Sequence, residues 1–225
     1  MQIEKLNRSE AFRYMSTGEG SEGKIKGELL KITEECEQML LKVIEPRFIY
    51  KIFDIKVCEN KVNVLNTSLT LKGKDISDHL KGCSRCVLLC VTLSAGVDKL
   101  IRTYETEGME KALVADSLAS AAVEQACELA EKEIRSAVGN YGYTWRFSPG
   151  YGDFPLDIQE ELLKVIDAPK RIGVNVTDSL ILIPRKSVTA VIGVSENEVP
   201  KGRRGCGSCN MKDRCQYRKT YAHCG

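Results

Sequence analysis

The chain has 225 residues, of which 43% are apolar and 28% charged, so it can bury a core of ordinary size. Its formal net charge of +2 gives no strong overall preference for an anionic partner, and its length predicts one domain with or without an appendage. The first 14 residues contain no apolar run, and no segment has the length of a membrane-spanning helix. We therefore expect a cytoplasmic protein without a secretory signal or a membrane partner.

The first 45 residues predict two helices separated by glycines. Ser9 is placed to cap the first helix, and the glycines at positions 18, 20 and 23 are expected to break it. Apolar residues recur at helical spacing from Leu29 to Val43, which predicts a second helix with one buried face. Pro46 is expected to end that helix.

Strand patterns follow. Residues 48–57 are rich in aromatic and β-branched side chains, and Glu59-Asn60 suits a hairpin turn. Apolar residues at 62, 64, 69 and 71 predict a second strand. The continuous apolar run of residues 86–93 predicts a central strand that is buried on both faces.

Residues 112–138 predict one long helix, because they contain neither Gly nor Pro and are rich in Ala, Leu, Glu and Lys. Alanines at positions 115, 119, 122 and 126 form a stripe of small side chains, which permits close approach by another backbone. We interpret the stripe as a packing surface and expect the helix to run through the middle of the fold.

The rest of the domain predicts one more helix and three short strands. Pro155 suits the first position of the helix, and Pro169 is expected to stop it. The strand patterns at 172–176, 180–183 and 188–194 are too close together for helical crossovers, so we expect antiparallel strands. The predicted fold class is α+β, with a twisted, mainly antiparallel sheet, flanking helices and a long central Ala-rich helix, followed by a Cys-rich C-terminal tail.

The segment RFSPGYGD, residues 146–153, is the strongest candidate for a functional site. Pro149-Gly150 fits the two central positions of a type II turn, and Ser148 before the proline is pushed into an extended conformation. Arg146 carries a rigid fork suited to a carboxylate, and Tyr151 lies among several aromatic residues. These features suit a zwitterionic ligand with a flat ring, although the same residues can also form a simple turn between two helices.

Four segments together resemble a known family. RFSPGYGDFPL (146–156) and LIPRKSVTAVIG (182–193) look like the S-adenosylmethionine-binding activation domain of cobalamin-dependent methionine synthase, which carries an arginine, then Pro-Gly-Tyr, then a strand with a Pro-x-x-Ser-Val segment. The similarity extends to TLSAGVDKLI (92–101) and ADSLASAAVEQ (115–125). It covers roughly residues 25–195.

The resemblance implies a role for each residue of the turn. Arg146 would pair with the methionyl carboxylate of S-adenosylmethionine. The backbone and ring of the residues that follow, Ser148 and Pro149-Gly150-Tyr151, would contact the same ligand. These five residues are therefore expected to bind the cofactor.

Two departures from the family pattern concern the rest of the ligand. Ser120 stands where the family has an acid for the ligand's amino group, so Asp116 or Glu124, one turn to either side, would have to replace it; we prefer Glu124. Val191-Ile192 replaces an aromatic pair of the family's last strand, so stacking of the adenine would be lost or moved.

The implied function is that of a stand-alone reactivation module, which would support reductive methylation of cob(II)alamin as one component of the methionine synthase reaction. The expected partners are a cobalamin-binding methionine synthase or another corrinoid protein, and an electron donor such as flavodoxin or ferredoxin. The chain lacks the family's cobalamin-binding loop D-x-H-x-x-G, because Ser77 precedes His79 where the aspartate belongs. A partner would therefore carry the cobalamin.

The ten cysteines need another explanation, since disulfides are rare in the cytoplasm. A domain over residues 1–200 is followed by a tail over 201–225 that carries seven Lys and Arg against one acid, a net charge of +6. In the tail, four cysteines suit an iron–sulfur cluster or zinc, although they can also remain without metal or form disulfides. They are Cys206, Cys209, Cys215 and Cys224.

The other cysteines are interpreted as packing residues. Cys83, Cys86 and Cys90 form C-x2-C-x3-C, the reverse of the order found in radical enzymes, and two of them lie in the apolar strand pattern. The isolated cysteines at positions 36, 58 and 127 are interpreted in the same way. Two alternative functions remain: an iron–sulfur reductive activase of other corrinoid methyltransferases, and a zinc-dependent nucleic-acid-binding protein that uses the basic tail.

Overall fold

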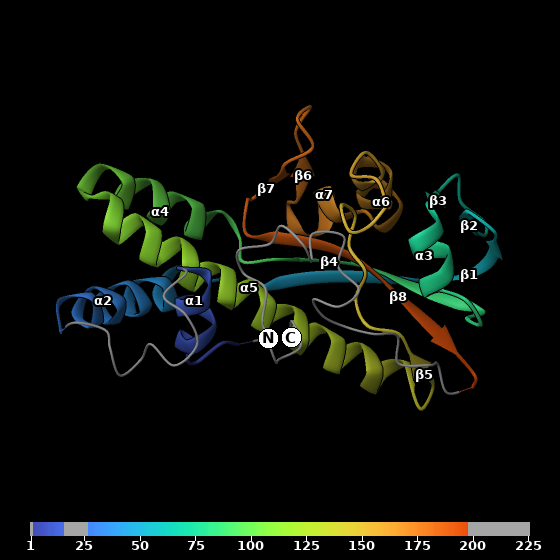
Figure 1. Cartoon of the computed structure of the whole chain (residues 1–225), viewed down its shortest axis with the longest axis horizontal. Coiled ribbons are helices and arrows are strands. Elements are labelled where there is room, and N and C mark those ends of the chain that lie inside the picture. The colour runs from blue at the N-terminus through green and yellow to red at the C-terminus, as the bar shows by residue number, and fades with distance from the viewer. Residues whose placement is uncertain (1, 16–26, 198–225) are drawn as a thin grey trace. The chain divides into compact units, whose positions relative to one another are not determined.

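The computed structural model describes residues 2–15 and 27–197 (Figure 1). The chain divides into two compact units. Unit 1 comprises Met1–Phe48, Val91–Glu133 and Leu182–Ser187, and unit 2 comprises Ile49–Cys90, Ile134–Ile181 and Val188–Gly225. The predicted class is confirmed: the described residues have an α+β fold with an antiparallel six-stranded sheet and a long central helix. The Cys-rich tail lies outside the described residues.

Unit 1 is mainly helical. Its elements are α1 (Arg8–Tyr14), α2 (Gly27–Val43), α4 (Ala95–Glu107) and the first 25 residues of α5 (Met109–Val138), shown in Figure 1. Helix α2 buries Cys36 and Leu40 at i, i+4 spacing, as the periodicity of the sequence indicated. Two other apolar residues of that pattern, Leu30 and Met39, are exposed, so the predicted buried face is only partly correct. α2 contacts α4, and Gly96 at the start of α4 leaves no room for a Cβ beside the Val43 carbonyl oxygen.

Unit 2 contains most of the sheet, which has the strand order β3-β2-β1-β4-β8-β5. The strands are β1 (Arg47–Cys58), β2 (Lys61–Val64), β3 (Thr70–Lys72), β4 (Arg85–Thr92), β5 (Gly142–Tyr143) and β8 (Ser187–Ser195). As predicted, β4 is a central strand, and its side chains from Cys86 to Val91 are fully buried. Backbone hydrogen bonds from Ile55 N to Ser84 O and from Ser84 N to Val194 O join the neighbouring strands.

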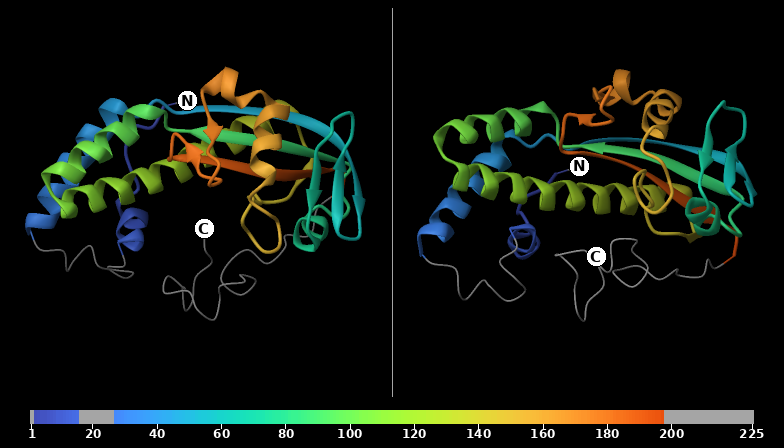
Figure 2. Two further views of the ribbon diagram at one scale, coloured as in Figure 1. Left: turned by 90° about the horizontal axis from the view of Figure 1, so that it is seen from above. Right: turned by 45° about the horizontal axis from the view of Figure 1, so that its top comes forward.

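Five further elements complete the described part of the fold. Three are helices: α3 (Lys74–His79), α6 (Ile158–Ile166) and α7 (Ala168–Ile172). The other two are the short strands β6 (Asn175–Val176) and β7 (Leu182–Ile183), which form a separate sheet. Figure 2 shows α6 and α7 on one face of the strands β1, β4 and β8. Lys51 Nζ of β1 donates a hydrogen bond of 2.9 Å to the Val165 carbonyl oxygen of α6 and so fixes that helix to the sheet.

Several local predictions were wrong in position. The cap of α1 is Asn7, whose side chain accepts from Glu10 N, and not Ser9. Residues 62–71 form two strands instead of one, because Asn66 adopts a positive φ of 62° and turns the chain so that Val62 pairs with Leu71. Extended structure was expected here from the apolar alternation, but as a single strand without the turn.

The two prolines around α6 also act differently from the prediction. Pro155 lies before the helix, which begins at Ile158. The helix ends at Ile166 because Asp167 takes a left-handed conformation with φ of 64°, and Pro169 then belongs to the first turn of α7. The strand expected over residues 172–176 is correspondingly reduced to β6.

Candidate functional site

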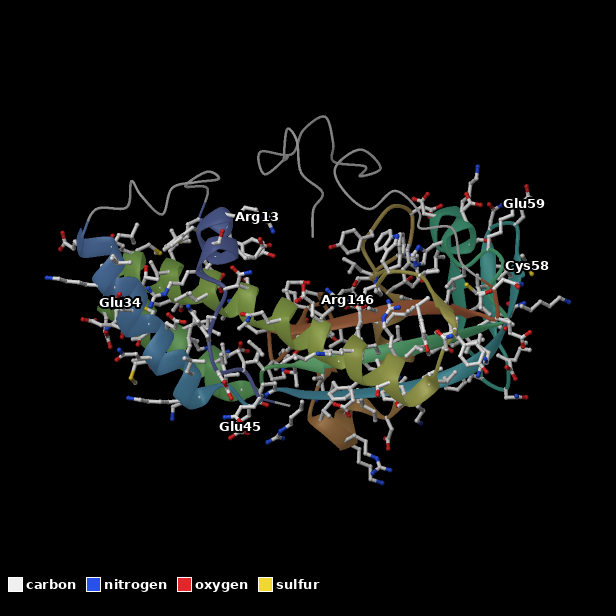
Figure 3. All side chains as sticks on the ribbon, turned by 90° about the horizontal axis from the view of Figure 1, so that it is seen from below. Arg13, Glu34, Glu45, Cys58, Glu59 and Arg146 are labelled. Atoms are coloured by element: carbon white, nitrogen blue, oxygen red, sulfur yellow. The ribbon has the colours of Figure 1, made fainter. Side chains whose placement is uncertain are left out.

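The segment 146–153 begins beside strand β8 of the sheet. Phe147 forms an antiparallel bridge with Val191, and both backbone hydrogen bonds of the pair measure 2.9 Å. Arg146, labelled in Figure 3, is one residue before this bridge and is buried, with only 9% of its surface exposed. The bridge therefore fixes the position from which the arginine side chain extends.

The predicted turn is present. Tyr151 N donates to Ser148 O over 3.2 Å, and Gly150 between them has a φ of +92°, as the second central residue of a type II turn requires. Gly150 N also donates to Phe154 O over 2.8 Å, and the Phe154 side chain is buried. Residues 148–154 thus form a short closed loop, which the buried Phe154 side chain attaches to the core. Gly150 and Tyr151 of this loop are exposed.

An aromatic cluster lies beneath this loop. The ring of His79 in α3 is centred 4.7 Å from Trp145 and 4.9 Å from Phe147, and Phe147 in turn contacts Tyr151 and Phe154. Tyr151 is 56% exposed. The cluster thus supports the loop on an apolar base, at whose edge Tyr151 keeps much of its surface exposed.

His79 is electrically neutral in this environment. Burial lowers its pKa to about 4, although a hydrogen bond to the Trp145 carbonyl oxygen, at 2.9 Å from Nε2, acts in the opposite direction. Because a carbonyl oxygen only accepts, Nε2 carries the proton. The sequence had shown His79 only as part of an incomplete H-x-x-G pattern, and its contact with the loop was not expected.

The two acids expected to meet the amino group of the ligand, Asp116 and Glu124, lie on α5 within unit 1. Lys186 Nζ is 2.8 Å from Asp116 Oδ1 and 2.9 Å from Ser120 Oγ, and its side chain is 13% exposed. Asp116 is therefore already paired with a cation. Sequence reasoning missed Lys186, since nothing in the pattern RKS predicts a partner on a helix 70 residues away.

Glu124 lies near Tyr14 of α1, also in unit 1. The pKa of Tyr14 is raised mainly by burial and further by the nearby carboxylates of Glu10 and Glu124. Glu124 is half-buried.

The residues that replace the family's aromatic pair are not available to stack on a ligand. Val191 and Ile192 lie in β8 and are 0% and 2% exposed. Among the aromatic residues between positions 145 and 154, Trp145 and Tyr151 retain exposed surface.

The cysteines of the sheet are structural. Cys83, Cys86 and Cys90 are buried, as are Cys36 and Cys127, whereas Cys58 at the end of β1 is only half-buried. Burial raises the pKa of Cys86 to about 12, which keeps its thiol protonated. Among residues 2–15 and 27–197 no cluster of three or more His, Cys, Asp or Glu could hold a metal ion.

The predicted metal ligands lie outside the described residues. They are Cys206, Cys209, Cys215 and Cys224. Within the described part of the chain, no helix combines the length and apolar character needed to cross a membrane.

No protein-family model and no curated protein sequence matches this chain significantly. Among solved structures, the fold is similar to the crystal structure of the MetH reactivation domain bound to AdoHcy. The TM-score is 0.67 and the sequence identity 14%, over 89% of this chain and 77% of that chain. At this identity the likeness establishes a shared fold, that of a methionine synthase reactivation domain.

Proposed function

We propose that this protein binds S-adenosylmethionine through residues 146–151 and acts in the reactivation of a cobalamin-dependent methionine synthase. The observation that carries the proposal is the loop itself, which holds Arg146 and the Pro149-Gly150-Tyr151 turn together on a fold similar to that of an AdoHcy-bound reactivation domain. AdoHcy is the product that S-adenosylmethionine becomes when its methyl group is transferred, so one site can hold both.

The residues of the loop suit the amino acid part of this ligand. Arg146 offers paired N–H donors for a carboxylate from a nearly buried position, where such a bond is stronger than in water. Gly150 has no side chain and lies at an exposed turn, so a ligand can approach its backbone closely. Tyr151 beside them is 56% exposed and can contribute its ring to the site.

Glu124 as the acid for the amino group of the ligand stays a prediction from the resemblance. Asp116, the other acid that the resemblance offers, is already paired with Lys186 at 2.8 Å. Its carboxylate would have to leave that pair before it could bind another cation.

When bound, S-adenosylmethionine supplies a methyl group to reduced cobalamin. The residues of this chain contribute binding and orientation: they hold the carboxylate and the ring of the donor so that its sulfonium faces a partner. We propose that the partner is a cobalamin-binding methionine synthase or another corrinoid protein, and that a flavodoxin or ferredoxin provides the electron. The chain would act as a separate module that meets both.

Calorimetric titration with S-adenosylmethionine tests the assignment. Arg146→Ala should weaken binding roughly 10- to 100-fold, the range expected for the loss of a hydrogen bond to a charged group. The same variant should lose as much affinity for AdoHcy, because both ligands carry the carboxylate. Arg47→Ala is the matched control, since Arg47 is exposed and forms a salt bridge of 2.8 Å with the surface residue Glu45.

Equal affinities in the wild type and Arg146→Ala would contradict the assignment, as would the absence of binding by the wild type. A loss of affinity in Arg47→Ala of the same size would show that the effect is one of general charge.

A further inference from the structure

Helix α3 is joined to the candidate segment, residues 146–153, by a reciprocal pair of carboxylates. Asp153 at the end of the loop accepts hydrogen bonds from Lys74 N (2.7 Å, to Oδ2) and from Asp75 N (2.9 Å, to Oδ1). In return, Asp75 Oδ2 accepts a hydrogen bond of 3.1 Å from Asp153 N. We call this arrangement the Asp75–Asp153 clamp. It satisfies two backbone donors at the start of α3 that have no acceptor within the helix.

The opposite end of α3 is attached to the other end of the loop. His79, the last residue of α3, donates from Nε2 to the Trp145 carbonyl oxygen over 2.9 Å. Trp145 precedes Arg146, and Asp153 follows Gly152. One short helix thus holds both ends of the segment that lies between Trp145 and Asp153.

Two glycines show how closely the backbones approach at the clamp. A Cβ on Gly73 would lie 2.6 Å from Asp153 Oδ1, and a Cβ on Gly152 would collide with the side chain of Asp75. Both residues also have a positive φ, of 126° and 56°. Only glycine satisfies both conditions at either position, so the chain is built to bring these segments together.

From these contacts we propose that Asp75 and Asp153 are positioning residues that hold residues 146–151 in their ligand-binding conformation. The inference rests on the proposed function, because that function makes the loop a binding site. Two anchored ends limit the conformations that the loop can adopt, so less entropy is lost when a ligand orders it. Neither carboxylate needs to touch the ligand for this effect.

The test compares Asp153→Ala with Asp153→Asn and with Asp157→Ala. Asp157 is an exposed aspartate only four residues away, and its side chain makes no capping hydrogen bond, so it is a matched control. Calorimetry with S-adenosylmethionine should show a loss of affinity of about tenfold in Asp153→Ala. Asp153→Asn retains one oxygen acceptor and should recover part of the affinity, and Asp157→Ala should bind like the wild type.

Hydrogen exchange of the ligand-free protein supplies a readout that does not depend on binding. In Asp153→Ala the amides of Lys74 and Asp75 should exchange at least about tenfold faster, since they lose their acceptors. The buried amides of β4 should exchange at the wild-type rate, which shows that the fold is intact. Asp157→Ala should leave all of these rates unchanged.

The outcomes separate the two proposals. Unchanged exchange at Lys74 and Asp75 would overturn the clamp. Faster exchange with an unchanged affinity would overturn the positioning role. If the wild type does not bind S-adenosylmethionine, the proposed function fails and the positioning role with it, whereas the exchange rates still decide whether the clamp exists.

Discussion

At the scale of single residues, burial of His79 links stability to pH. The folded protein holds this side chain neutral with a pKa of about 4, whereas an unfolded histidine has a pKa near 6.5. Between these values the unfolded chain binds more protons than the folded one, so the free energy of unfolding falls as the pH is lowered. The stabilisation is complete above about pH 6.5 and is lost progressively toward pH 4.

We therefore expect the free energy of unfolding to fall by about 2 kcal/mol between pH 7.5 and pH 5 on account of His79. Denaturant unfolding followed by the fluorescence of Trp145, the only tryptophan, measures this difference. His79→Gln should reduce the pH dependence by that amount, because glutamine can donate to the Trp145 carbonyl oxygen and does not titrate.

His223→Gln is the matched control, since these two are the only histidines of the chain. An equal reduction in both variants, or none in His79→Gln, would show that His79 does not carry the effect.

The sequence revealed the local part of the candidate site. Pro149-Gly150 predicts its turn from two adjacent residues, because the preferred φ of each belongs to the residue itself. The contacts of Asp116 could not be predicted in this way. Its partner Lys186 is 70 residues distant and meets it only through the tertiary fold, and the same holds for the 78 residues that separate Asp75 from Asp153.

At the scale of elements, helix α5 carries the stripe of small residues that the sequence predicted. All four alanines of the stripe are fully buried: Ala115, Ala119, Ala122 and Ala126. Protein interiors are close-packed, so a larger side chain at such a position forces its neighbours or the backbone to move. The stripe should therefore tolerate little increase in volume.

Ala122→Leu should lower the free energy of unfolding by about 1–3 kcal/mol, as expected for overpacking of a buried site. Ala137→Leu makes the same substitution at an exposed position of the same helix and should change stability by less than about 0.5 kcal/mol. Chemical denaturation of both variants measures the difference. Similar values for the two would mean that the stripe is not closely packed.

Long periodic elements were predicted better than their ends. Helix α5 and strand β4 follow from runs of residues with one unambiguous pattern. The end of α6 does not, because Asp167 adopts its left-handed conformation in a context that only the folded chain supplies, and Pro169 can both follow one helix and open the next. Asn66 did offer a signal, since asparagine tolerates positive φ, and it marks the turn between β2 and β3.

At the scale of the whole molecule, charge is unevenly distributed along the chain. Residues 201–225 carry +6 and the preceding 200 residues carry −4. The four tail cysteines follow all the residues proposed to bind S-adenosylmethionine. We propose that the tail binds metal only for its own structure, and therefore expect metal binding by the tail to be separable from ligand binding by the domain.

Replacing Cys206, Cys209, Cys215 and Cys224 together by serine in the full chain should remove bound iron or zinc, because the serine hydroxyl is a poor substitute for a thiolate ligand. The affinity for S-adenosylmethionine should change by less than about twofold, since Arg146 and its turn are unaltered. Elemental analysis and calorimetry on the same preparation measure the two properties.

Cys58→Ser, at a half-buried cysteine of β1, is the matched control and should retain the metal. Metal that persists in the fourfold variant would refute the tail ligands, and a parallel loss of affinity would show that the tail takes part in the ligand site.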